Sequence, residues 1–332
     1  NTAVGKSALA AFTTGNKNTV LGYQAGDAVT TGNYNVLLGS DAGGGITTGG
    51  NNVVIGHQAM DAAAGAADGM VAIGVESLST FNGGNVDSSV AVGEYALNSL
   101  TDGVSNVAVG PFALRYTTGG YNTAIGASAA YNMTTGDDNV AIGYNALGIA
   151  GAASDNTAVG NKAGRLAVKT QFSTLVGMQA GEYATGSYNT FVGGNAGRGG
   201  TSSAPYSSGV NNVAMGFEAL KVFTTGGHNV AIGYRSGLDL TTGNYNTFLG
   251  RESGFEVTTN EGSVFLGYQA GKNTNGAYHY NIAIGMQALS AAHTTAGTIA
   301  IGYKSAEALT SGAGNLAIGY EAMKTHTTGG RN

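Results

Sequence analysis

The strongest constraint on this chain is a short motif that recurs nineteen times along its 332 residues. The motif usually reads Asn-x-x-aliphatic-Gly, and its closing glycine returns after 17 residues in twelve of the eighteen intervals. Five other intervals are 16, 18 or 19 residues long, and the interval from Gly193 to Gly216 is 23. A fixed period of this kind is typical of stacked repeats, in which each repeat buries its apolar side against its neighbours.

The three residues before each motif glycine predict a short strand. The residue directly before the glycine is Val, Ile, Leu or Met in every copy, and the residue three before it is Thr, Val or Ile in all except Leu316. These two positions share one face of a strand, and we expect that face to point into the coil. The residue between them is also apolar in every copy, most often alanine. Both faces of the strand therefore avoid water.

A strand that is apolar on both faces needs cover outside its own coil. The sequence contains no convincing helix that could supply this cover, so it favours copies of the same chain packed side by side. A monomeric solenoid that tolerates an exposed alanine-rich face is the alternative. We predict an all-β fold, a parallel β-roll or β-solenoid of about nineteen 17-residue coils. Residues 1–332 would form a single repeat domain within a longer fibre, and residues 194–215 a coil that bears an insertion.

The motif asparagine and glycine are expected to have structural roles. Stacked coils place equivalent asparagines above one another, where their amides can form a hydrogen-bonded ladder, and asparagine also tolerates a left-handed backbone at a corner. Thr-Thr-Gly recurs eight times, and its glycine is expected to adopt the positive φ of a tight turn. The third residue after the motif glycine is always Ala or Ser, which predicts a close backbone approach in a second short strand or bend. Representative structural positions are Asn18, Gly22, Asn139, Gly143, Asn229, Gly233, Asn315 and Gly319.

Composition excludes several classes of protein. Charged residues make up 10% of the chain, and 58 glycines occur with only 2 prolines and no cysteine. These values argue against collagen, a disordered chain, a disulfide framework and a thiolate metal site. A net charge of −5 argues against nucleic-acid binding, and no apolar run is long enough for this segment to insert into a membrane.

The residues that could carry chemistry are scattered. The five histidines lie in different coils, and no pair of carboxylates recurs at a fixed spacing. We therefore expect no catalytic residue, no metal site and no cofactor. An enzyme acting on polysaccharides remains an alternative, because some β-helical enzymes build a site on one face of the coil stack.

Tyrosine supplies the candidate surface contacts. Tyr144, Tyr234 and Tyr268 each follow a motif glycine, and residues at one repeat position line up along the stack. An amphipathic ring at the surface suits contact with sugars or proteins, although such rings can also just cover neighbouring turns. Tyr206 lies in the 23-residue interval, where an insertion is expected to form a loop on one face, and a neutral insertion explains that loop equally well.

The run from Asn139 to Ala146, Asn-Val-Ala-Ile-Gly-Tyr-Asn-Ala, resembles the head repeat of trimeric autotransporter adhesins, the YadA-like head. Close copies occur at 122–126, 229–233 and 315–319, and the resemblance extends over essentially the whole chain. It implies a left-handed parallel β-roll, three chains around a common axis and binding to host surfaces. Similar repeats occur in phage tail fibres. The coils here are longer than the usual adhesin repeat, and neither a heptad stalk nor a barrel anchor is present.

We therefore expect a non-enzymatic fibre segment that mediates attachment outside the cell or at its surface. Its partners would be further copies of itself, as a homotrimer or higher fibre, and a protein or glycan receptor on a host surface. A phage tail-fibre shaft on a virion, with a receptor-binding role, is the nearest alternative. Ice binding is a further alternative, which requires a flat outward array of threonines.

Overall fold

The computed structural model describes all residues except 63–65, 81–87, 201–205, 275–278, 292–293 and 332. The chain divides into two compact units, Asn1–Lys169 and Thr170–Asn332. The described residues of both units form three-residue strands and no helix, so none of them forms a helix long and apolar enough to cross a membrane. The all-β class is confirmed, while the single repeat domain over residues 1–332 stays a prediction.

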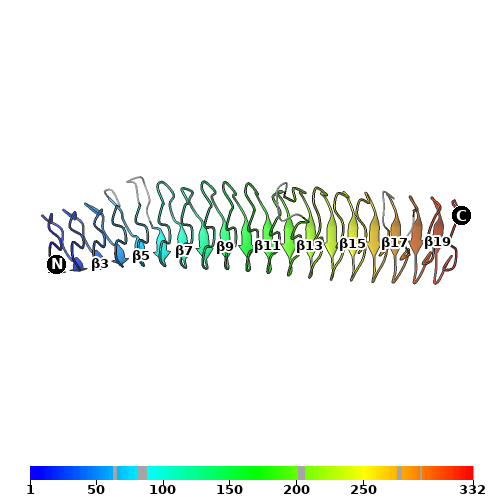
Figure 1. Ribbon diagram of the computed structural model, residues 1–332, viewed down its shortest axis with the longest axis horizontal. Helices are drawn as coiled ribbons and strands as arrows, with labels where there is room; N and C mark the ends of the chain where they lie inside the picture. Colours follow the sequence, from blue (N-terminus) through cyan, green and yellow to red (C-terminus); the bar gives the residue numbers. More distant parts are fainter. Residues whose placement is uncertain (63–65, 81–87, 201–205, 275–278, 292–293, 332) are drawn as a thin grey trace. The chain divides into compact units, whose positions relative to one another are not determined.

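Each unit is a stack of coils that contribute one strand each (Figure 1). The strands of the first unit are β1 (Thr2–Val4), β2 (Thr19–Leu21), β3 (Val36–Leu38), β4 (Val53–Ile55), β5 (Val71–Ile73), β6 (Val90–Val92), β7 (Val107–Val109), β8 (Thr123–Ile125), β9 (Val140–Ile142) and β10 (Thr157–Val159). Those of the second unit are β11 (Thr174–Val176), β12 (Thr190–Val192), β13 (Val213–Met215), β14 (Val230–Ile232), β15 (Thr247–Leu249), β16 (Val264–Leu266), β17 (Ile282–Ile284), β18 (Ile299–Ile301) and β19 (Leu316–Ile318).

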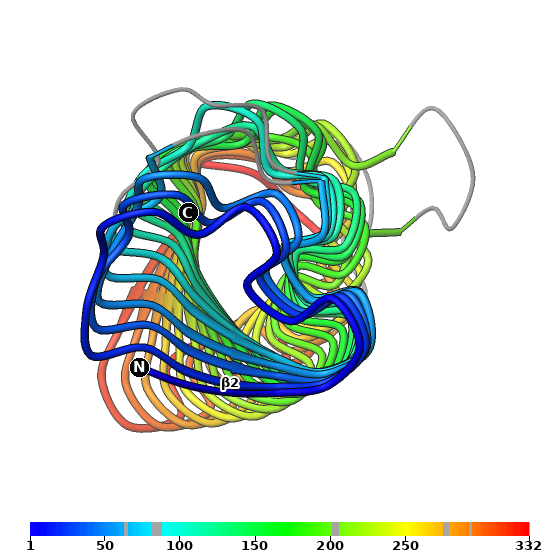
Figure 2. The same cartoon turned by 90° about the vertical axis from the view of Figure 1, so that its left-hand side faces the viewer.

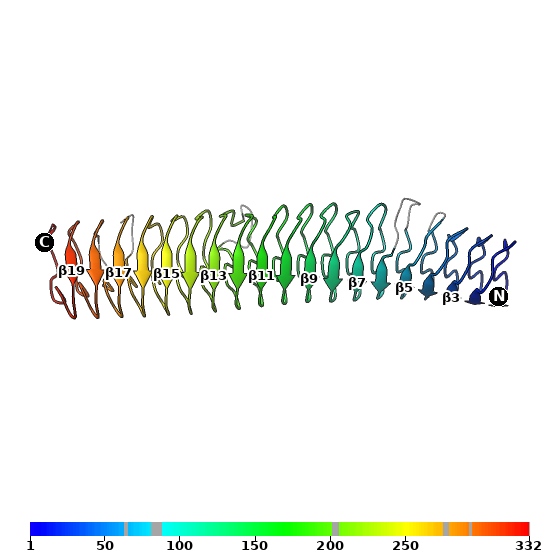
Figure 3. The same cartoon turned by 180° about the vertical axis from the view of Figure 1, so that it is seen from behind.

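Within each unit, successive strands pair in parallel and in register. Val140 lies opposite Thr123 on one side and Thr157 on the other, so each strand position forms a column along the stack. The strands of successive coils lie on the same side of the stack, as Figure 3 shows from behind, and the rest of each coil closes the loop around the core (Figure 2). The β-solenoid of about 17-residue coils is therefore confirmed.

The direction in which the strand side chains point is opposite to the prediction. The middle residue of nearly every strand is buried, as Ala141 is in β9, whereas the first and third residues are partly or fully exposed. In β9 these are Val140, which is half-buried, and Ile142, which is 36% exposed. The mostly β-branched positions thus form the outer surface, and the small middle residue faces a coil too narrow for two large side chains.

In most coils, two core positions vary in size in opposite directions, so that a large residue at one is matched by a small residue at the other. We call this pattern the size exchange. One position is the middle residue of the strand, and the other is the fourth residue after the motif glycine. A large strand residue is generally paired with glycine, as Phe265 is with Gly271, because a Cβ atom on Gly271 would lie 2.6 Å from Cγ of Phe265. Alanine in the strand is usually paired with a larger residue, as Ala283 is with Leu289 in the next coil, and both are fully buried. Close packing explains the exchange, because each coil holds about one large side chain at this point.

The bend after the motif glycine has an unusual backbone. In every coil the second and fourth residues after this glycine have a positive φ, for example Asn145 (54°) and Leu147 (47°). Main-chain groups of the bend bond to neighbouring coils, and Leu147 N–H donates to the Ala163 carbonyl at 3.0 Å. The small residue between these positions, Ala146, is fully buried. The predicted close approach is therefore confirmed as a bend, with no second strand in the described residues.

The asparagine ladder is confirmed. Asn229 donates its side-chain amide to Oδ1 of Asn212 at 3.1 Å and to the Gly243 carbonyl at 2.9 Å. Its own Oδ1 accepts the main-chain N–H of Asn246 at 2.9 Å. These asparagines are almost fully buried, so their amides supply the hydrogen bonds that neighbouring buried polar groups would otherwise form with water. Asn18 and Asn139 lie in the same column and bond in the same way, and Asn315 donates its amide to the carbonyl of Gly329 at 2.9 Å.

Two expectations about the backbone are wrong. The positive φ at the corner belongs to the residue before the motif asparagine, such as Tyr34 (60°), and not to the asparagine itself. The glycine of Thr-Thr-Gly also lacks a positive φ in seven of the eight copies, including Gly226, and only Gly329 has one (125°). It is glycine for a steric reason, because a Cβ atom there would lie 2.5 Å from the carbonyl oxygen of Gly243 in the next coil. Most motif glycines, by contrast, combine a positive φ with such a contact, and Gly143 has φ of 127°.

Candidate interaction surface

In each unit, the first and third residues of the strands form an outward surface, which we call the strand face. Its third-residue column is aliphatic or Met throughout, and its first-residue column is Val, Ile, Leu or Thr. Ile125 is 40% exposed and Met215 is 41% exposed, so large apolar side chains lie at the surface in both units. Contiguous exposed apolar surface of this extent is typical of an interaction site.

Two rows of aromatic side chains flank the strand face. One row follows the motif glycine and includes Tyr144 (49% exposed), Tyr234 (39%) and Tyr268 (36%). The other row precedes the motif asparagine and includes Tyr188 and Tyr245, which are 52% and 60% exposed. The structure therefore places these three candidate contact tyrosines at the surface, at the same coil position, with Tyr144 in the first unit and Tyr234 and Tyr268 in the second.

Rings in these rows contact their neighbours in adjacent coils. Phe217 and Tyr234 stack with centroids 5.9 Å apart, and in the other row the centroids of His228 and Tyr245 are 4.9 Å apart. The guanidinium of Arg251 lies 5.4 Å from the ring centroid of Tyr234. Such contacts hold the rings in place, so the rows present ordered aromatic surface.

The loop expected in the 23-residue interval stays a prediction, because its residues 201–205 lie outside the described residues. Tyr206 beside them is half-buried. Ser207 is again bound to the stack, because its Oγ donates a hydrogen bond to the Phe223 carbonyl at 2.7 Å. Tyr206 stays a candidate contact, but its described position is less accessible than those of the row tyrosines.

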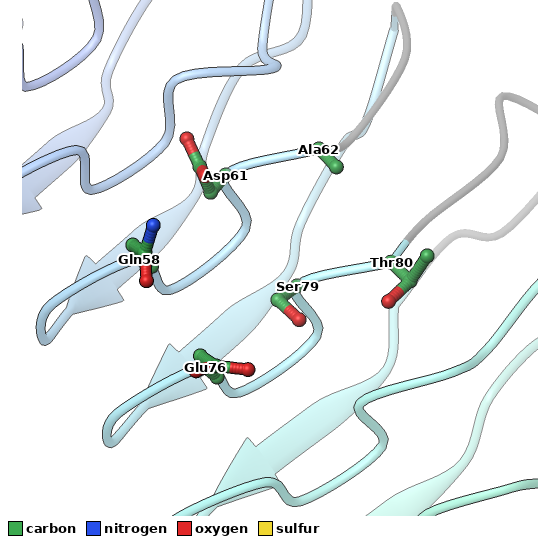
Figure 4. Close-up of a pocket in the computed structure, with 6 residues that line it drawn as sticks. All are labelled: Gln58, Asp61, Ala62, Glu76, Ser79 and Thr80. Carbon is green, nitrogen blue, oxygen red and sulfur yellow. The ribbon is translucent and has the colours of Figure 1, made fainter.

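A small polar pocket lies on the bend of the first unit, away from the strand residues (Figure 4). It has a volume of about 180 Å³ and is formed by three pairs of residues at equivalent positions of two successive coils. The six lining residues are Gln58, Asp61, Ala62, Glu76, Ser79 and Thr80. Burial, together with the neighbouring carboxylates Asp41 and Asp27, raises the pKa of the Asp61 carboxyl.

An arginine surrounded by aromatic rings occupies the same bend positions a few coils further along. The guanidinium of Arg115 lies 4.7 Å from the ring centroid of Tyr95, 5.4 Å from that of Phe112 and 5.0 Å from that of Tyr116. Its Nε is buried without a hydrogen-bond partner. The Tyr95 hydroxyl donates to Glu76 at 3.1 Å, and this hydrogen bond raises the pKa of Tyr95.

Sequence reasoning missed this cluster. Its residues occupy the second, fifth and sixth positions after successive motif glycines, and alignment of the coils by those positions would have brought them together. The tyrosine rows were found because they adjoin the motif itself.

The part of the chain that the structure describes contains no group of three His, Asp or Glu side chains that could hold a metal ion. His293 lies outside the described residues.

Comparisons with known proteins give no assignment. No protein-family description, no curated protein and no solved structure matches the chain.

Proposed function

We propose that this chain is a segment of a non-enzymatic extracellular fibre that mediates attachment to a surface. Three copies would pack through the strand face, and the tyrosine rows and bends would remain available for a receptor. The fibre would lie on a cell surface, or on a virion if the chain is a tail-fibre shaft. The resemblance to YadA-like heads supports the number of chains and a left-handed coil.

The strand face is the observation that carries this proposal. Its third-residue column is aliphatic or Met throughout, and most residues of its first-residue column are Val, Ile or Leu. Exposed apolar surface of this extent on one face of a sheet is typical of an interface. Complete burial of a Val, Leu or Ile side chain contributes about 1.5–3 kcal/mol, so one that is roughly 40% exposed would gain about 0.5–1 kcal/mol in an interface. Repetition over many coils multiplies this gain beyond the cost of association.

The same surface argues against ice binding. Threonine occupies the first strand position in a minority of coils, and Val or Ile takes most of the others. Many hydroxyls of the Thr-Thr-Gly turns are also used within the stack, since Thr224 Oγ1 donates to the Thr241 carbonyl at 3.0 Å. An ordered outward array of threonine hydroxyls is therefore not formed by these residues.

The test is the molar mass of the purified chain in solution, measured by light scattering and sedimentation. We expect three times the single-chain mass. A strand-face variant, Ile125→Lys with Ile142→Lys, should dissociate to single chains with an unchanged β spectrum, because each lysine would have to be buried in the interface.

The control places lysines on two exposed turn residues of the coil between these strands, Asn132→Lys with Thr135→Lys, and should leave the trimer intact. A wild-type chain that is stable, folded and monomeric at micromolar concentration would refute assembly through the strand face. Attachment is tested separately by binding of the trimer to immobilised matrix proteins and glycans, and a trimer that binds neither would refute the adhesive role.

A further inference from the structure

The bends of the first unit carry charged side chains that form no ion pair among the described residues. The second and fifth positions after the motif glycine form two adjacent columns along each stack. In the second unit, charges in these columns are paired, as in Arg235–Glu218 at 2.8 Å and Arg198–Glu182 at 3.0 Å. In the first unit, Asp61, Glu76 and Arg115 occupy the same columns without an ion-pair partner among the described residues.

We infer that these bends form a binding site for a neutral oligosaccharide, a strip that runs from the polar pocket at Gln58, Asp61 and Glu76 to the aromatic cluster around Arg115. This inference rests on the proposed attachment function and names its receptor class. We call these residues the bend strip. It spans five coils, which at one strand spacing each corresponds to about 19 Å between the first and the last.

The polar end of the strip matches sugar hydroxyl groups. Gln58 offers both an amide donor and an acceptor, Ser79 and Thr80 offer hydroxyls, and the carboxyl groups accept hydrogen bonds. Glu76 also joins the two ends of the strip, because it accepts the hydrogen bond from the Tyr95 hydroxyl.

The aromatic end supplies apolar surface and fixed donors. The rings of Tyr95 and Phe112 are parallel within 6°, with centroids 5.5 Å apart, and Tyr116 is 37% exposed. Tyr131 contacts Tyr116 edge-on at 5.2 Å. Mostly apolar surface with a few convergent polar groups is what small-ligand sites provide, and the C–H faces of a sugar ring fit against such rings.

The mixture of charges selects a neutral ligand. Asp61 and Glu76 would repel a polyanion at one end of the strip, and Arg115 would repel a polycation at the other. A neutral oligosaccharide meets neither penalty, and its hydroxyl groups can donate to the carboxyl groups and accept from the guanidinium. The strip contains no strand residue, so assembly through the strand face would leave it accessible.

The experiment uses the whole chain and an array of neutral hexasaccharides: cellohexaose, chitohexaose, laminarihexaose and mannohexaose. Heparin and oligogalacturonate provide the acidic arm. The test variant is Tyr95→Gln with Phe112→Gln, since glutamine occupies this coil position elsewhere with the same left-handed backbone, as at Gln24. The control is Phe255→Gln, a half-buried ring in the bend of the second unit.

We expect wild type and the control to bind at least one neutral hexasaccharide. The affinity of the double variant for it should be lower by about tenfold or more. If the double variant loses its β spectrum, Glu76→Gln with Arg115→Gln takes its place with the same expected loss. The assignment is overturned if wild type binds only the acidic polymers or none of the probes. It is also overturned if both strip variants bind the neutral hexasaccharide as tightly as wild type. A trimer that attaches to matrix proteins but to no neutral glycan would refute the bend strip and leave the fibre proposal standing.

Discussion

The size exchange in the core leads to a quantitative prediction for Phe265 and Gly271. Phe265→Ala should destabilise the fold, and so should Gly271→Leu, but the two together should cost much less than their sum. The double variant reproduces the pairing found in the next coil, where Ala283 and Leu289 occupy the same two positions and both are fully buried.

The magnitudes follow from the local geometry. Phe265 is fully buried, so its truncation should cost about 3–5 kcal/mol. Part of this, about 0.5–1.5 kcal/mol, is its stacking on Phe248 at a centroid distance of 5.2 Å. Leucine at position 271 would overlap the Phe265 ring at a cost of about 1–3 kcal/mol, and φ of 58° adds about 1–2 kcal/mol.

If these costs were independent, the double variant would lose about 5–10 kcal/mol of unfolding free energy. The new leucine instead fills the cavity left by the phenylalanine, and we expect a favourable coupling of about 0.5–3 kcal/mol. The penalty for a left-handed leucine remains, as it does at Leu289, where φ is 53°.

Urea unfolding followed by circular dichroism measures the cycle, at one fixed protein concentration because assembly affects apparent stability. Phe265→Ala combined with Lys162→Ala, a substitution in the other unit, provides the control cycle and should be additive. Additivity of the Phe265 and Gly271 substitutions within about 0.5 kcal/mol would refute the size exchange.

Three further predictions test the ladder, the motif glycine and the carboxylates. Asn229→Ala leaves buried main-chain groups unpaired and should cost about 2–5 kcal/mol in chemical unfolding, whereas Asn229→Ser should cost less because serine holds this position in other coils. Gly143→Ala places a Cβ atom 2.6 Å from a carbonyl oxygen of the next coil and should lower stability well beyond Gly319→Ala, where the nearest atom is 3.9 Å away; equal unfolding midpoints would contradict this. The hydrogen bond from Gln269 lowers the pKa of Glu252 below 4.5, so its contribution to stability is present above that pH and is lost as the pH falls through the lowered value. Gln269→Ala should flatten this acid-side decline, and an unchanged pH profile would count against it.

Much of the architecture was predictable because residues within each repeat specify it. The strand before the motif glycine, the parallel stacking and the ladder through Asn229 all follow from residues that recur at one spacing. Stacking at a fixed period then requires equivalent residues to meet, so the columns needed no long-range information.

The backbone of the turns was harder to predict. Threonine, threonine and glycine suggested a positive φ at the glycine, but the close carbonyl of the neighbouring coil selects glycine there instead. The left-handed residues are ordinary side chains such as Tyr34 and Leu147, which local propensity disfavours. Bonds between coils outweigh that preference, and they exist only once the stack has formed.

Of the candidate interaction surfaces, one was predictable from the sequence and one was not. The tyrosine rows adjoin the motif and were predicted from it. The polar pocket and the ring cluster at Arg115 combine residues of several coils that belong to no motif, and their lack of ion-pair partners is a property of the folded bend.

The sequence by itself determined the period, the strand position, the asparagine column and the apolar character of both strand faces. Only the tertiary structure decided which face lies inside, because hydrophobicity cannot choose between three consecutive apolar residues. The choice depends on the asparagine ladder and the width of the coil. The motif asparagine points inward, and the middle strand residue two positions later shares its side. The narrow interior holds about one large side chain per coil at this point, so the first and third strand residues are left outside.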